Sequence, residues 1–300
     1  MRQYLEIKEK HQDCIIFFRM GDFYEMFFED AVTASKVLEI TLTSRNKGKD
    51  DSIPLCGVHH HAASSYIAKL IDKGFKVAVC EQVEDPKEAK GIVKREVVRV
   101  ITPGLVVDSS NLEEKENNFL AGFSATGGTI GLAFIDISTG EFWVTEADDE
   151  QLLLNEISGL NFREVIAEDE LRKSAFFKSF VRMKDSYVNY LPSDYFVVDG
   201  AASFFKEYFD QGQLDEIDFE NRKTMSAAAC AVLRYVKETQ KDGFGHINTM
   251  KWYPLSTYLI LDDTARRNLE IFATIQENRK VGSLFHVLDQ TVTSMGGRRL

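Results

Sequence analysis

Hydrophobic residues in the first third of the chain form short runs separated by polar turns, and their spacing changes from one run to the next. Four runs have the length and composition of strands, at residues 15–20, 53–58, 76–82 and 96–102. Two stretches between them have apolar residues at helical spacing, at residues 23–38 and 60–73. Strands that alternate with amphipathic helices predict a mixed α/β domain over residues 1–105.

The middle of the chain predicts a second α/β domain with a different order of elements. Three strand patterns separated by turn residues come first, at residues 119–123, 131–137 and 141–145. They are followed by a helix near 149–160, strands near 164–167 and 195–199, a helix near 200–209 and an Ala-rich helix at about 224–240. A meander followed by alternating strands and helices is the order of an RNase H-like fold, which we predict for residues 119–250.

Two further segments complete the predicted organisation. Residues 106–118 are polar, charged and free of aromatic side chains, which predicts a linker. The pattern is helical from Leu261 onward, and it is unfinished at Leu300. Residues 251–300 are therefore expected to be the truncated start of an all-helical domain.

The net charge of −11 is distributed unevenly. Residues 1–105 are neutral, residues 106–220 carry a net charge of −16, and residues 221–300 carry +5. Because an acidic surface repels DNA phosphates, any contact with nucleic acid is expected in the first third. The acidic middle is expected to face solvent or a protein partner.

Composition also restricts the cellular setting. Hydrophobic residues make up 44% of the chain, enough for real cores, but no apolar stretch has the length of a membrane span. The first residues are charged and have no signal-peptide pattern. The four cysteines are widely separated with no CxxC spacing, which predicts buried free thiols in a reducing cytosol.

Residues 19–27, Arg-Met-Gly-Asp-Phe-Tyr-Glu-Met-Phe, contain the most informative candidate chemistry. An apolar ring, Phe23, stands two positions before a carboxylate, Glu25, just after a Gly-Asp turn. Such a ring can insert between base pairs, and insertion costs least where pairing is already faulty. The carboxylate can hydrogen-bond a base edge, while phosphates repel it. Together the two residues have the chemistry to test whether a duplex is damaged.

A purely structural interpretation competes with this one. Apolar residues fall on one helical stripe at Phe23, Phe27, Ala31, Ala34 and Leu38. Asp22 would then be the N-cap of the helix, and Glu25 the N3 residue of a capping box. In that case Phe23 packs in the core and Glu25 only caps a helix. The hydrophobic pattern by itself favours this interpretation.

A resemblance spread over the chain points back to the first interpretation. It is carried by residues 17–27, 40–45 (Ile-Thr-Leu-Thr-Ser-Arg), 53–58 (Ile-Pro-Leu-Cys-Gly-Val), 61–62, 79–83, 85–86, 99–104, 261–262, 267–270, 282–284, 288–289 and 295–296. In family order, from about residue 4 to the last residue, these segments resemble the MutS family of DNA mismatch repair proteins. One departure is His59-His60-His61, where the family usually has a proline two residues before its His-Ala. We expect the departure to leave Phe23 and Glu25 untouched.

The resemblance implies a domain organisation and a set of site residues. Residues 1–105 would be the mismatch-recognition domain, 119–250 the connector domain and 251–300 the start of the lever domain. Phe23 would stack on a mispaired base from the minor groove while Glu25 hydrogen-bonds that base. Arg45 matches a DNA-contacting arginine of the family. Lys47, in the same polar loop, and Arg95, beside the strand near 96–102, are further candidates for DNA contact.

Partners follow from the same resemblance. Mismatched double-stranded DNA is the expected ligand, a MutL-type protein would bind the connector, and self-association belongs to the full-length family protein. The sequence contains no Gly-x-x-x-x-Gly-Lys-Ser/Thr motif. The chain is therefore expected to be an N-terminal fragment without the family's ATPase, with no catalytic residue, metal or cofactor of its own, whereas ATP and Mg²⁺ serve the full-length protein. The expected location is the bacterial cytosol, associated with the nucleoid.

Three alternatives remain open on sequence alone. An RNase H-like nuclease would use Asp136 and require further carboxylates within about 4 Å of shared metal ions; the candidates are Glu168, Asp169 and Asp199. A MutS relative outside repair would bind junctions or act as a scaffold, although the Phe-x-Glu pair argues against it. The three consecutive histidines resemble a metal site, but neighbouring side chains point in different directions, which favours a solvated helix start.

Overall fold

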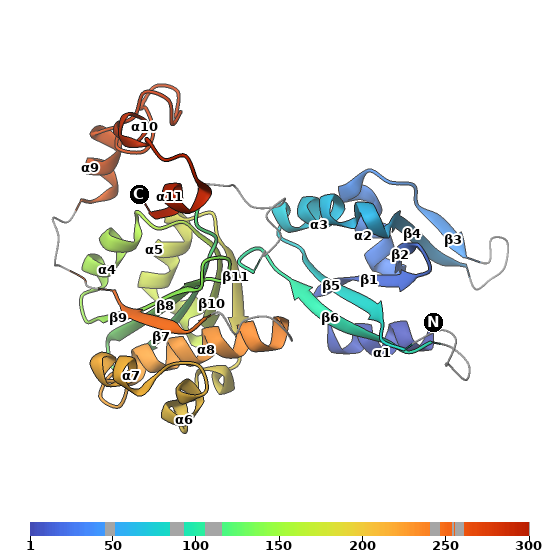
Figure 1. Cartoon of the computed structure of the whole chain (residues 1–300), viewed down its shortest axis with the longest axis horizontal. Coiled ribbons are helices and arrows are strands. Elements are labelled where there is room, and N and C mark those ends of the chain that lie inside the picture. The colour runs from blue at the N-terminus through green and yellow to red at the C-terminus, as the bar shows by residue number, and fades with distance from the viewer. Residues whose placement is uncertain are drawn as a thin grey trace. The chain divides into compact units, whose positions relative to one another are not determined.

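The structure, a computed structural model, describes residues 1–45, 52–84, 93–105, 116–240, 247–253, 255 and 261–299. The chain divides into two compact units: Met1–Asn111 with Val236–Gly243, and Leu112–Tyr235 with Phe244–Leu300. Each unit contains a six-stranded mixed sheet with helices packed against it (Figure 1). No helix in the described ranges combines the length and the apolar character that crossing a membrane requires.

The sheet of the first unit has the order β3-β4-β2-β1-β5-β6. Its strands are β1 (Cys14–Met20), β2 (Phe23–Phe27), β3 (Thr43–Arg45), β4 (Ile53–His59), β5 (Lys76–Gln82) and β6 (Arg95–Ile101). Strands β1 and β5 are parallel, and the other neighbours are antiparallel. The helices are α1 (Arg2–Lys10), α2 (Phe28–Leu38), the 3-10 helix η1 (His60–Ala62) and α3 (Ala63–Asp72). Helix α1 covers one face of the sheet, and α2 and α3 cover the other (Figure 1).

A buried carboxylate joins three elements of this unit. Asp30 of α2 accepts hydrogen bonds from the Tyr4 hydroxyl of α1 (2.7 Å) and from the backbone N–H of Ile16 in β1 (3.1 Å). It also pairs with Lys8 Nζ at 2.8 Å. Burial, and then the Asp30 carboxylate, raise the pKa of Tyr4 well above its ordinary value, so the phenol remains a donor. Asp30 therefore holds α1 against α2 and β1.

The helix predicted over residues 23–38 begins only at Phe28, and this part of the prediction is wrong. Residues 23–27 form strand β2, which is paired on one side with β1 and on the other with β4. Two aromatic residues four positions apart fit a strand as well as a helix, because both periods return a side chain to the same face after four residues. Phe28, with φ of +53°, separates the strand from the helix. Asp22 is not an N-cap, and Glu25 belongs to no capping box.

The four predicted strands of the first unit correspond to β1, β4, β5 and β6, each within one residue at either end. The helix predicted over 60–73 corresponds to η1 and α3. Helix α1 and the short strand β3 were not predicted. Three residues carry too little pattern to indicate a strand, and β3 owes its place to its pairing with β4.

The sheet of the second unit has the order β11-β10-β7-β8-β9-β12. Its strands are β7 (Phe119–Thr126), β8 (Thr129–Asp136), β9 (Glu141–Ala147), β10 (Phe162–Glu168), β11 (Tyr187–Leu191) and β12 (Thr249–Trp252). Strands β7 to β9 form an antiparallel meander, and the remaining strands are added parallel to their neighbours. A meander followed by alternating strands and helices is the order that the sequence predicted for this mixed α/β unit, whereas the parallel direction of the added strands was not predicted.

The second unit also contains α-helices and short 3-10 helices. They are α4 (Glu150–Ile157), η3 (Asp169–Lys173), α5 (Ala175–Met183), η4 (Ser193–Phe196), α6 (Ala201–Lys206), α7 (Gln211–Ile217), α8 (Lys223–Thr239), α9 (Asp263–Asn268), α10 (Leu284–Leu288) and α11 (Ser294–Arg299). The Ala-rich helix α8 lies close to the sheet (Figure 1) because β7 carries a glycine, Gly122, where it faces the helix. A Cβ atom at Gly122 would lie 2.6 Å from Cγ2 of Val232.

The strand predicted near 195–199 is wrong. Residues 195 and 196 are the end of the 3-10 helix η4, and residues 197–199 follow it. The strand paired with β10 lies earlier, at β11. Pro192 and Gly200, which has φ of +78°, confine the apolar run between them to a short connection. Strand β11 is at the sheet edge and only partly buried, so its residues lack the apolar pattern of a central strand. Strand β12 and helices α5 and α7 were also not predicted.

Candidate nucleic-acid interface

Phe23 is the first residue of β2 and follows the Gly21-Asp22 turn, where Gly21 has φ of +60°. Side chains 23, 25 and 27 share one face of the strand. At one end of that face, Tyr4 of α1 packs on Phe27 with ring centroids 5.1 Å apart, and Phe27 is buried. At the other end Phe23 is 40% exposed. Phe23 is therefore not a core residue, contrary to the purely structural interpretation.

Glu25 lies between these two rings on the same face and is half-buried. Its strand neighbours are Phe18 on β1 and Gly57 on β4, so an aromatic ring flanks it on one side and a bare backbone on the other. Burial raises the pKa of Glu25 above its ordinary value, and the positive charge of Arg45 offsets part of that rise. The site thus holds a carboxyl group that is harder to ionise than one in water.

We expect Glu25→Gln to stabilise the chain, and to do so only where the carboxyl ionises. The pKa of Glu25 is raised in the folded state. In the pH window between the ordinary carboxyl pKa and this raised pKa, the folded chain therefore binds more protons than the unfolded chain. Stability therefore falls as pH rises through that window, and Gln removes the loss. Thermal unfolding should give equal Tm values for the two proteins at about pH 3.5 and a higher Tm for Glu25→Gln at about pH 7.5. A gain of the same size at both pH values would contradict the assignment.

The basic candidates differ in how they are held. Arg45 ends β3, is exposed, and its charge reaches Glu25. Arg95 begins β6, where its Nε donates to the carbonyl of Arg19 at 2.7 Å and its guanidinium lies 5.2 Å from the ring centroid of Phe18. Part of its donor capacity is therefore used within the protein. Lys47 lies outside the described residues.

His59 joins this site, although the sequence pattern gave no indication of it. It is the strand partner of Phe23, and the centroids of the two rings are 4.1 Å apart with an interplanar angle of 35°. The expectation that the three histidines leave Phe23 and Glu25 untouched is wrong for Phe23. The contact could have been predicted from the pairing of strand 23–27 with strand 53–59. Because the sequence analysis predicted a helix at 23–27, it gave His59 no strand partner.

The three histidines are otherwise solvated, as predicted. All three are exposed, and His60 and His61 form the turn of 3-10 helix that leads into α3. The ring centroids of His59 and His61 are 5.2 Å apart in a stacked arrangement. Among the residues that the structure describes, no group of histidine, cysteine and acidic side chains has the geometry to hold a metal ion.

The carboxylates required for a nuclease do not come together. Asp136 ends β8 beside Phe119, and its side chain accepts hydrogen bonds from the backbone N–H of Asn118 (3.1 Å) and from Ser138. Glu168 instead accepts one from Ser124 at 2.8 Å. Phe119 and Ser124 are five residues apart along β7, about 16 Å, whereas shared metal ions require about 4 Å. Asp199 is not on a strand at all. The structure therefore does not support a metal site shared by Asp136 and Glu168.

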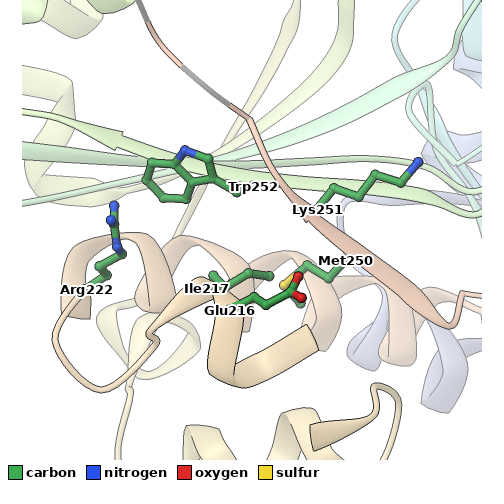
Figure 2. Close-up of a pocket in the computed structure, with 6 residues that line it drawn as sticks. All are labelled: Glu216, Ile217, Arg222, Met250, Lys251 and Trp252. Carbon is green, nitrogen blue, oxygen red and sulfur yellow. The ribbon is translucent and has the colours of Figure 1, made fainter. Parts of the chain in front are cut away.

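A polar cavity of about 320 Å³ lies in the second unit (Figure 2). It is lined by Glu216, Ile217, Arg222, Met250, Lys251 and Trp252. The guanidinium of Arg222 lies 4.0 Å from the ring centroid of Trp252 and 3.6 Å from a carboxylate oxygen of Glu146. The Arg222 cation is therefore already stacked and ion-paired within the protein.

Family sequence models match nearly the whole length of the chain in order. Residues 1–110 match MutS domain I, residues 118–248 match MutS domain II, and residues 264–300 match MutS domain III. The chain belongs to the MutS family. The match to MutS domain I contains five of the residues described above: Phe23, Glu25, His59, Arg45 and Arg95.

Relatives agree with this assignment. Three proteins named DNA mismatch repair protein MutS align over the whole chain: 44% identical in Lachnoclostridium phytofermentans, 47% in Desulforapulum autotrophicum and 45% in Clostridioides difficile. The alignments cover 32%, 34% and 31% of those proteins. The chain thus spans about a third of the length of the curated MutS relatives it matches.

Proposed function

We propose that this chain is the mismatch-sensing part of a MutS protein, in which Phe23 stacks on a mispaired base from the minor groove. The observation that carries the proposal is the 40% exposure of Phe23, beside the half-buried Glu25 and at the open end of β2. Phe23 is the first residue of a strand that is paired on both sides, with β1 and with β4. Its exposed ring is therefore accessible to a duplex and is held by a rigid scaffold.

The selectivity comes from what a mismatch has already lost. Unstacking a base step costs a few kcal/mol, and bending a site costs about 1–6 kcal/mol more. A mispair has weaker pairing and stacking, so both costs are lower than in an intact duplex. Phe23 therefore inserts and gains its stacking contact only at the mispair, and the lower cost there becomes a difference in affinity.

Glu25 adds a polar test next to the ring. Burial disfavours its ionised form, and the phosphates of a bound duplex would disfavour it further. In its protonated form the carboxyl donates a hydrogen bond to an acceptor on the displaced base; in its ionised form it accepts one. On intact DNA, where the base stays stacked, the group finds no partner and opposes binding.

Positive charge around this pair would hold the duplex. Arg45 is exposed on strand β3 and is the best candidate for a phosphate contact. Arg95, which already donates to the Arg19 carbonyl, would contribute less. Lys47 is a further proposed contact. Phosphate contacts of this kind strengthen binding without choosing between mismatches.

The rest of the chain would pass the signal on. We infer that the domain II and domain III segments connect the bent-DNA state to an ATPase and a MutL-type partner, and that self-association belongs to the full-length protein. The net charge of −16 over residues 106–220 supports a protein partner rather than DNA for that region. We therefore assign DNA recognition to residues 1–105, and we propose no chemical step for them.

The test is a band-shift competition with the full-length MutS protein that carries this sequence. A labelled duplex with one mismatch is bound and then displaced by unlabelled mismatched or matched duplex of otherwise identical sequence. We expect the mismatched competitor to displace at a concentration at least about tenfold lower, the factor that 1.4 kcal/mol provides. Equal competition by the two duplexes would contradict the proposal.

Glu25→Ala should raise the affinity for intact duplex relative to mismatched duplex. The substitution removes the group that opposes binding to a stacked base and also the hydrogen bond to the displaced one. A hydrogen bond of a neutral group contributes about 0.5–1.5 kcal/mol, so the mismatch-to-matched affinity ratio should fall by about 2- to 10-fold.

Glu25→Gln provides the matched comparison in the same competition experiment. Glutamine keeps the shape and a hydrogen-bonding group but carries no charge, so it should retain more of the ratio than alanine does. A ratio that is unchanged in Glu25→Ala would remove Glu25 from discrimination.

A further inference from the structure

Phe23 lies at one end of a row of three neighbouring aromatic rings, of which His59 is the middle one. The ring centroids of Phe23 and His59 are 4.1 Å apart, and those of His59 and His61 are 5.2 Å apart, with interplanar angles of 35° and 29°. We propose that His59 is a positioning residue that fixes the Phe23 ring in the orientation required for stacking on a base. The inference rests on the proposed function, because it assigns the support of the same sensing ring.

His59 is held in place on both sides. Its backbone is the antiparallel partner of Phe23 at the end of β4, and its ring lies between Phe23 and His61. The next residue ties this end of the sheet to the turn before Phe23, since the backbone N–H of His60 donates to the carbonyl of Asp22 at 2.9 Å. Turn, strand end and stacked rings therefore form one locally fixed unit.

A fixed ring matters because Phe23 is exposed. An aromatic side chain on the open end of a strand otherwise populates several χ1 rotamers, and a duplex that binds it must select one of them. That ordering lowers the affinity gained from the contact. A flat neighbour at stacking distance restricts both the rotamer and the plane of the ring before DNA arrives. His59 is the residue that supplies this flat surface, and His61 prevents it from turning away.

The effect should appear in selectivity rather than in overall binding. In the full-length MutS protein that carries this sequence, His59→Ala should reduce the mismatch-to-matched affinity ratio by about 2- to 10-fold, the range expected for one aromatic pair. Affinity for the matched duplex should stay within about twofold, because the ring is not inserted there. His59→Phe, which keeps a flat ring, should restore the ratio.

Two controls separate positioning from folding. His11→Ala makes the same chemical change at the C-cap of α1 and should leave the ratio unchanged. His59→Leu keeps apolar bulk on β4 without a flat ring, so it should lower the ratio relative to His59→Phe even if His59→Ala does not fold. Thermal unfolding of each variant establishes that the fold is intact.

The outcomes distinguish this inference from the function on which it rests. If Phe23→Ala loses selectivity while His59→Ala and His59→Leu retain it, the positioning role is overturned and mismatch sensing stands. If Phe23→Ala itself keeps full selectivity, the proposed function fails. A drop in the ratio for His59→Leu with rescue by His59→Phe supports the inference.

Discussion

Replacing Phe23 with alanine is expected to abolish the preference for mismatched DNA while leaving the protein folded. A ring stacked on a base is worth about 1–3 kcal/mol, which corresponds to a roughly 5- to 150-fold change in affinity. Only the mismatched complex contains that contact, so the loss falls on it alone. The fold should survive because the ring is 40% exposed and the strand keeps its pairing with β1 and β4.

The measurement is the same band-shift competition, together with thermal unfolding. Tyr66→Ala is the matched control: it removes a partly exposed aromatic ring from α3, which covers the other face of the sheet. We expect that control to keep the preference, and Phe23→Ala to shift the unfolding free energy by no more than about 1 kcal/mol. A Phe23→Ala variant that unfolds would show that the ring is a packing residue after all, and one that still prefers mismatches would end the stacking mechanism.

The contrast between Phe23 and Phe27 explains how far the sequence could predict this site. The two residues share a strand face, yet one is exposed and the other is buried under Tyr4. Their different environments depend on where α1 ends over the sheet, and α1 is brought there by Asp30, which is distant in sequence. Local periodicity contains no such information. It indicated two rings on one face, which is correct, and assigned them to a helix, which is not.

Strands that are buried on both faces of a sheet were predicted well, because their own residues carry the signal. Strands β1, β5 and β8 lie inside their sheets and read as continuous apolar segments, so hydrophobicity alone marks them. Strands β3 and β11, which have no buried residue, take their conformation from a neighbour rather than from their own residues. The contact between His59 and Phe23 also depends on a neighbouring strand, because it exists only through the register of β2 on β4.

Replacing Asp30 with alanine is expected to be the most destabilising single change in the first unit. Its side chain is 7% exposed and accepts hydrogen bonds from Tyr4 and Ile16 as well as pairing with Lys8. Removing one member of such a buried group leaves the other members without their partner and typically costs about 3–5 kcal/mol. Because Tyr4 packs on Phe27, the loss would also loosen the support of β2.

Asp13 offers a matched control, because it makes a comparable ion pair in an exposed setting. Its carboxylate lies 2.7 Å from Lys76 Nζ, but its side chain is 65% exposed, so Asp13→Ala should cost only about 0–1 kcal/mol. Both tryptophans, Trp143 and Trp252, lie in the second unit, so their fluorescence does not report on the first. Amide hydrogen exchange in α1 and β1 does, and it should become much faster in Asp30→Ala than in Asp13→Ala. Equal exchange in the two variants would mean that solvent replaces the Asp30 carboxylate, and that the first unit is held by its apolar contacts alone.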